Sequence, residues 1–133
     1  YFADTRENRL YRVACDPETG LPVDDPVLTV EGNQMPGGID GSVTDAQGTI
    51  WNARWGGARI DAWSPRGELI RSIRMPARQI SCPAFIGLDA RRLVATSAFS
   101  GMDDEARKAD PQAGKTFLID LEVEGRLDPP VLL

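Results

Sequence analysis

An aspartate followed by a glycine, at the start of an expected strand, is the best candidate for chemistry in this sequence. Asp40 stands between Ile39 and Gly41, where small neighbours let the backbone bend sharply and let a ligand approach closely. A carboxylate presented in this way offers one hard oxygen ligand at the mouth of a pore in a sheet protein. Aspartate before glycine also commonly forms an Asx-type turn. The local pattern alone leaves these two roles equally open.

The absence of histidine narrows the kinds of catalysis that this chain can support. The chain contains no histidine, which excludes a Ser-His-Asp or Cys-His relay and a histidine-ligated zinc within it. Any hydrolysis must therefore use carboxylates, amides and a hard cation bound through oxygen. Cys15 and Cys82 lack a metal-type spacing, so both are predicted to be buried small apolar residues. For Cys82 the alternative is a position facing a central channel.

A pattern of strand, polar loop, strand and turn occurs three times, and these copies must position the candidate residues. Their opening strands begin at Tyr1, Ile50 and Leu93, about one propeller blade apart on the usual scale of roughly 40 to 50 residues. The middle copy predicts the four strands of a blade, at 42–46, 49–55, 59–63 and 69–74. The sequence thus predicts an all-β protein, a β-propeller of about three four-stranded blades. A self-contained sandwich of short strands is the less favoured alternative.

We expect residues 1–133 to form one partial propeller domain. Residues 1–31 are predicted to form an incomplete blade that lacks its inner strand, and residues 36–76 a complete blade. Residues 79–133 are predicted to form the last blade, with a long loop at 99–114. Because the first copy opens at its second strand and the chain has no initiator methionine, we expect a piece of a larger protein.

The expected blade order also predicts which loops share a face. In a four-stranded meander, the loop before the first strand and the loop between the second and third strands lie on the same face of the blade. Asp40 enters the innermost strand on this face, which predicts that it lies beside the central channel. Asp45 falls in an ordinary hairpin turn at the opposite end of the strand. In the long loop, a capping box beginning at Ser100 predicts a helical turn at 104–109 that Pro111 ends.

Charge and hydropathy exclude two classes of partner. The formal net charge is −5 and Lys and Arg form no basic stripe, so no nucleic-acid partner is predicted. No apolar run approaches the roughly 20 residues that a membrane span needs, so no membrane partner is predicted either. No signal peptide is visible, which makes the cytoplasm the default location.

Motifs along most of the chain carry a more specific signal. They lie at 1–5, 11–13 with the turn 16–20, 38–41 with 45–48, 51–57, 82–85 and 113–117. Together they resemble the SMP-30/gluconolactonase/LRE family of six-bladed propellers, the regucalcin-like sugar lactonases, over its C-terminal half. The resemblance implies one divalent cation, such as Ca²⁺ or Zn²⁺, held above the channel by Glu, Asn and Asp from different blades. Asp40 matches the Asp, with Ile39 in place of the usual proline, and the other ligands would lie upstream of Tyr1.

The resemblance also implies a function, a metal-dependent hydrolase of sugar lactones of the gluconolactonase or aldonolactonase type. Asp40 would then be the metal ligand and the base for the attacking water, while Trp55, Cys82 and Phe85 would line the pocket without a catalytic role. The partners implied are a small sugar lactone and either the missing N-terminal half of the propeller or further copies of this chain. The alternatives are a non-catalytic calcium-binding or ligand-binding propeller and a related propeller esterase. The isolated piece is expected to be inactive.

Overall fold

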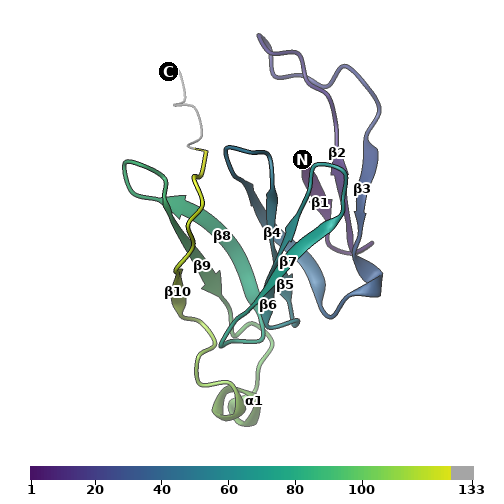
Figure 1. The fold of residues 1–133 in the computed structure, drawn as a ribbon. Coiled ribbons are helices and arrows are strands. Elements are labelled where there is room, and N and C mark those ends of the chain that lie inside the picture. Colours follow the sequence, from purple (N-terminus) through teal and green to yellow (C-terminus); the bar gives the residue numbers. More distant parts are fainter. Residues whose placement is uncertain (127–133) are drawn as a thin grey trace.

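The computed structural model describes residues 1–126 as three antiparallel sheets that follow one another along the chain (Figure 1). The first sheet contains β1 (Phe2–Asp4), β2 (Arg9–Arg12) and β3 (Val27–Glu31). The middle sheet contains β4 (Gly38–Thr44), β5 (Ile50–Trp55), β6 (Arg59–Trp63) and β7 (Leu69–Arg74). The third sheet contains β8 (Ile80–Ile86), β9 (Arg92–Ser97) and β10 (Thr116–Ile119). Two short helices, η1 (Gly32–Gln34) and α1 (Asp104–Ala109), lie in the connections.

Within every sheet the strands pair in the order in which they occur in the sequence. Each sheet is therefore a simple meander, and the middle sheet contacts the third through β4 and β5 against β8. Figure 1 shows the first sheet on one side of the middle sheet and the third on the other. Successive four-stranded meanders packed face to face are the arrangement of propeller blades, whereas a sandwich would need two facing sheets.

The core of the protein lies on both faces of the middle sheet. One hydrophobic cluster joins it to the first sheet and consists of Leu10, Val30, Ile39, Ile50 and Trp63. The other joins it to the third sheet and includes Trp51, Ala53, Ile60, Ala62, Ile80, Leu93 and Ala95. Because both faces of β5 are covered, its first five residues are all buried instead of alternating between buried and exposed. The outer strand β7 is largely exposed, as expected for the edge of a blade.

Most predicted strands of the middle sheet lie at the expected residues, and one begins earlier. β6 and β7 occupy 59–63 and 69–74 as predicted. β4 was expected to begin at residue 42 but begins at Gly38, because Gly38 and Ile39 already pair with the end of β5. Asp40 consequently lies inside β4 and not in the loop that leads to it.

The helical turn at 104–109 is confirmed as α1, although its N-cap differs from the expected one. The residue at the N-cap is Asp103, whose side chain accepts a hydrogen bond of 2.8 Å from the backbone nitrogen of Ala106. Ser100 had been expected in that role. Its distance from the first helical residue is too large, because α1 begins at Asp104 and the chain is extended at Asp103. No helix among residues 1–126 is long and apolar enough to cross a membrane.

Asp45 organises the hairpin between β4 and β5. Its side chain is almost fully buried and accepts hydrogen bonds from the backbone nitrogens of Gln47 and Thr49, at 3.0 and 2.8 Å. The indole nitrogen of Trp51 donates a third bond of 3.0 Å to its other oxygen. The carboxylate is therefore satisfied by donors from its own hairpin, which agrees with the turn-forming role expected for it.

We predict that Asp45→Ala lowers the free energy of unfolding by at least about 2 kcal/mol, because it leaves a buried indole N–H without an acceptor. Urea denaturation measures the change. Gln47→Ala is the matched control in the same turn, since that side chain is exposed, and it should change stability by less than about 0.5 kcal/mol. Equal stabilities for the two variants would show that the buried carboxylate does not hold the hairpin.

Candidate functional site

Asp40 lies in a β-bulge in the innermost strand of the middle sheet. Ile39 pairs with Arg54 and Ser42 pairs with Asn52, so the two residues Asp40 and Gly41 stand opposite the single residue between those partners. A bulge of this kind interrupts the alternation of side chains and gives the extra residue a new direction. The direction of the Asp40 carboxylate is therefore set by a local irregularity and not by the regular pleat.

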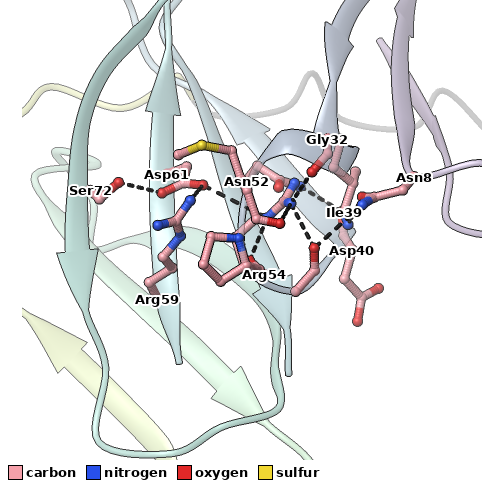
Figure 2. A network of polar contacts seen from close by, with 12 residues as sticks. Asn8, Gly32, Ile39, Asp40, Asn52, Arg54, Arg59, Asp61 and Ser72 are labelled. Carbon is pink, nitrogen blue, oxygen red and sulfur yellow. Dashed lines mark hydrogen bonds and ion pairs between the residues drawn. The ribbon is translucent and has the colours of Figure 1, made fainter. Parts of the chain in front are cut away.

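A fully buried arginine anchors the loop that leads to this bulge. The Nη2 of Arg54 donates to the carbonyl oxygens of Gly32 and Gly37, at 2.8 and 2.6 Å. Its Nε lies 3.7 Å from the Oδ2 of the buried Asp61 (Figure 2). Burial lowers the pKa of the Arg54 guanidinium, and the negative charge of Asp61 opposes that effect. This pairing lets a charged group hold the residues just before β4.

Asp61 in turn is held by groups from two other positions of its sheet. Arg59 Nη2 lies 2.9 Å from Asp61 Oδ2, and the hydroxyl of Ser72 donates to Oδ1 at 2.5 Å. Figure 2 shows Ser72 on the far side of Asp61 from Arg54, with the Arg59 side chain beside Asp61. We call Arg54, Arg59, Asp61 and Ser72 the Arg54 network. It links β5, β6 and β7 to the loop before β4.

The first sheet also contributes to the backbone around Asp40. The side-chain oxygen of Asn8 accepts a hydrogen bond of 2.7 Å from the backbone nitrogen of Ile39, which lies just before the bulge. Asn8 adopts a positive φ of 58°, a conformation that asparagine tolerates better than most residues. The turn between β1 and β2 thereby fixes the same stretch of backbone from the side opposite to β5.

The third sheet packs directly on the bulge at Gly41. A Cβ atom at Gly41 would lie 2.6 Å from the carbonyl oxygen of Ser81 and 2.9 Å from the Cα of Cys82. Only glycine allows β8 to approach β4 so closely. This contact brings the Cys82 thiol close to Asp40, and partial burial, with the Asp40 charge, raises the pKa of that thiol.

The expectation that both cysteines are buried is wrong. Cys15 and Cys82 are both exposed, with free thiols. Cys15 lies in the connection after β2, where only an isolated bridge to Pro22 covers it. Cys82 lies on β8, the strand of the third sheet that packs on β4, and its position at a central channel stays a prediction. The apolar character of cysteine did not decide its burial, because neither position faces one of the two hydrophobic clusters.

The Asp40 carboxylate faces a cavity and forms no ion pair among residues 1–126. Figure 2 shows it pointing away from the Arg54 network. Partial burial raises the pKa of Asp40, and a hydrogen bond from the backbone N–H of Gly41 acts in the opposite direction. The cavity measures about 340 Å³ and is lined, besides Asp40, by Tyr1, Phe2, Ala3, Thr5, Leu10, Gly41 and Ser42.

A half-buried carboxylate without a counter-charge fits a hard cation as one oxygen ligand, because the cation would supply the missing compensation. Residues 1–126 contain no group of three Asp, Glu, Cys or His side chains that could hold a metal ion by themselves.

Of the three residues expected to line the pocket, the structure places Cys82 beside Asp40. Trp55 pairs with Gly38 at the start of β4 and bridges to Gln79. Phe85 lies farther along β8, where it packs on the hydrophobic cluster shared with the third sheet and against Gly125. The aromatic residues that do line the cavity are Tyr1 and Phe2. Their place at the start of the first repeat was the one sequence signal that could have indicated them as lining residues.

A larger cavity of about 870 Å³ lies at the opposite end of β4, beside the Asp45 hairpin. Two of its three carboxylates have partners, and the third, Glu122, is exposed, whereas Asp40 is half-buried. Asp45 is bonded by its own turn, and Glu124 lies 3.6 Å from Arg91. The smaller cavity at Asp40 is therefore the better candidate for a cation or a polar substrate.

Comparison with known proteins gives the family. The model of the SMP-30/Gluconolactonase/LRE-like region matches residues 1–99. The chain belongs to this family. The match covers the first sheet, the middle sheet and the two inner strands of the third, and so includes the bulge at Asp40.

Relatives within the SMP-30/gluconolactonase/LRE family agree with this assignment. A protein of Rhizobium meliloti (strain 1021), provisionally named a sugar lactone lactonase, is 54% identical over 129 residues, 97% of this chain and 44% of its own length. The L-arabinolactonase of Azospirillum brasilense is 35% identical over 118 residues, 89% of this chain and 38% of its own length. The chain therefore spans less than half the length of these relatives.

A solved structure confirms the fold. The crystal structure of the calcium-binding protein regucalcin from Agrobacterium tumefaciens strain C58 superimposes with a TM-score of 0.95 at 47% identity. The match covers 100% of this chain and 45% of that one. The predicted all-β class and partial propeller are confirmed, and the alternative of a self-contained sandwich is wrong.

We predict that Gly41→Ala lowers the free energy of unfolding by about 1–3 kcal/mol, because the new methyl group would push β8 away from β4. Gly38→Ala is the matched control in the same strand, since a Cβ there would meet nothing within 4 Å. It should cause no loss of stability. Chemical denaturation of both variants checks the prediction, and an equal effect at the two positions would argue against close packing at the bulge.

Proposed function

We propose that the complete protein is a metal-dependent hydrolase of sugar lactones, in which this chain supplies C-terminal blades and Asp40 is one metal ligand. The observation that carries the proposal is the half-buried carboxylate in a bulge beside a cavity, which forms no ion pair with any other residue of 1–126. The names of the lactonase relatives support the substrate class. The calcium-binding description of the regucalcin structure supports a divalent cation, Ca²⁺ or a similar ion.

In the proposed reaction Asp40 has two tasks. One carboxylate oxygen would hold the cation, and the other would accept a proton from the water that attacks the lactone carbonyl. A bound cation would lower the pKa of Asp40 and keep the carboxylate ionised at neutral pH, as both tasks require. A bound cation would polarise the ring carbonyl as a Lewis acid. Hydrolysis then opens the ring and yields the hydroxy acid.

A propeller that binds calcium without catalysis is the second candidate, and the description of the regucalcin structure as calcium-binding favours it. The two functions make different demands on Asp40. A binding module needs it only as a ligand, whereas a hydrolase needs it to be accessible to water and substrate as well. Lactone turnover by the complete protein in the presence of the cation distinguishes them.

We predict that Asp40→Asn and Asp40→Ala in the complete protein each weaken cation binding and lower kcat/KM for aldonolactones by about a hundredfold or more. The expected size follows from the tenfold to hundredfold cost that loss of even an outer-shell partner has. Calorimetric titration with Ca²⁺ and a lactonase assay measure the two effects.

The matched control is Asp104→Asn, which removes an exposed carboxylate in α1 and should leave both quantities unchanged. Undiminished turnover in either Asp40 variant would remove Asp40 from the mechanism. Loss of Ca²⁺ binding in a protein that hydrolyses no lactone even before mutation would favour the binding module.

We further propose that the rest of the propeller, or a second copy of this chain, covers the open edges of the described sheets. The middle sheet has four strands, whereas the first and third have three each. The edge strands β1 and β10 also leave large apolar side chains exposed, Phe2 at 46% and Leu118 at 64%. Unpaired edges with apolar side chains promote association. The proposed location of the complete protein is the cytoplasm.

We predict that residues 1–133 produced alone will associate, and that Leu118→Lys will weaken the association, because a lysine at a sheet edge opposes strand pairing. Sedimentation velocity at several concentrations measures it. The matched control Lys115→Ala, just before β10, removes a charge and should not weaken association. A folded monomer at all concentrations would contradict the proposal that these edges need a partner.

A further inference from the structure

Asn52 is a polar residue that is fully buried in a central strand. It lies in the middle of β5 with no exposed surface, between the buried apolar residues Trp51 and Ala53. Asparagine is disfavoured in strands, and burying an amide is costly unless it is hydrogen-bonded. The contacts of this side chain therefore indicate what it contributes.

The amide nitrogen of Asn52 binds the bulge itself. It lies 2.9 Å from the carbonyl oxygen of Asp40, 2.9 Å from the hydroxyl of Ser42 and 3.4 Å from the carbonyl oxygen of Gly41. A bulge disturbs the backbone ladder at these residues. Asn52 supplies a side-chain donor where the regular ladder is interrupted.

The contacts use only the donor end of the amide. Among residues 1–126, the Oδ1 of Asn52 accepts no hydrogen bond. Turning the amide over would direct this oxygen toward the carbonyl oxygens of Asp40 and Gly41, which repel it. The position therefore needs a side chain with an N–H donor of this length, and no isosteric replacement without the donor can make the same contacts.

The other polar contacts hold the chain before the bulge. Arg54 binds the carbonyls of Gly32 and Gly37, and Asn8 binds the backbone nitrogen of Ile39. From β5, the side chain of Asn52 donates a hydrogen bond to the backbone carbonyl of Asp40 itself. Rotation of the backbone at Asp40 would move this carbonyl and would turn the carboxylate with it.

We infer that Asn52 is a positioning residue: by donating to the Asp40 and Gly41 carbonyls it keeps the bulge in the shape that directs the Asp40 carboxylate into the cavity. The inference rests on the proposed role of Asp40 as a cation ligand. Asn52 touches neither the cation nor the substrate and acts only through the backbone of Asp40.

The test uses Asn52→Leu and Asn52→Thr in the complete protein. Leucine keeps the approximate volume without a donor, and threonine favours a strand but is too short to reach the carbonyls. We expect each variant to raise the Kd for Ca²⁺ by at least about tenfold, the effect typical of lost outer-shell support. Titration calorimetry measures the Kd, and circular dichroism with thermal melting measures the folded state.

The matched control is Trp51→Phe. It lies on the same strand, is equally buried, and loses a hydrogen bond to Asp45 at the other end of the hairpin. A purely structural role for Asn52 predicts that both sites lose stability with an unchanged Kd. The positioning role predicts that Trp51→Phe keeps the wild-type Kd while a folded Asn52 variant does not.

A double variant distinguishes this inference from the proposed function. In an Asp40→Asn background, Asn52→Leu should weaken Ca²⁺ binding no further. If Asp40→Asn alone leaves the Kd unchanged, the proposed function fails. If Asp40→Asn abolishes binding but both folded Asn52 variants bind Ca²⁺ like the wild type, the function stands and the positioning role is overturned.

Discussion

The contacts of the fully buried Arg54 guanidinium are the interaction on which the rest of this structure depends. Arg54 holds two carbonyls of the loop before β4 while it faces the buried carboxylate of Asp61. A buried charge is tolerated only when it is paired and hydrogen-bonded, and removal of one partner is strongly destabilising. The planar fork of arginine suits a position where several oxygens must be bound at once. This network thus holds the backbone of the loop directly before β4.

The candidate site forms where all three sheets meet. The first sheet contributes Asn8, and the third sheet packs β8 on Gly41. The middle sheet contributes the bulge and the side chain of Asn52, which donates hydrogen bonds to it. Each contact fixes backbone and none neutralises the Asp40 carboxylate. Within residues 1–126 the fold therefore fixes the backbone of an acidic residue without pairing its charge, which is the combination that a ligand for a cation needs.

Membership of the SMP-30/gluconolactonase/LRE family gives this arrangement a functional context, while the chain itself spans less than half the length of its relatives. One carboxylate cannot hold a hard cation alone, since such ions take several oxygen ligands. If ligands come from different blades, cation binding also draws those blades together, so the integrity of the site and of the propeller would depend on each other. The open edges of the first and third sheets are consistent with further blades that would supply such ligands.

Local patterns in the sequence were sufficient to indicate much of this architecture. The repeat spacing predicted the sheets, the strands at 59–63 and 69–74 lie as expected, and the helical turn at 104–109 was predicted in the long loop. These features depend on residues close together in the chain. Asp40 itself could be singled out for the same reason, because a glycine beside an aspartate is a local signal.

The bulge, its support by Asn52 and the exposure of the two cysteines were decided by tertiary structure. A bulge is a difference in register between two strands, so no single strand sequence reveals it. Asn52 reads as an unfavourable residue in a strand until its three acceptors on β4 are known. Gly41 likewise reads as a flexible point, whereas β8, about forty residues later in the sequence, makes it a close contact. The sequence by itself determined which residues can bind a cation or turn the chain. Packing between sheets determined which of them lies half-buried beside a cavity and where it points, because burial and direction depend on neighbours that are distant in the chain.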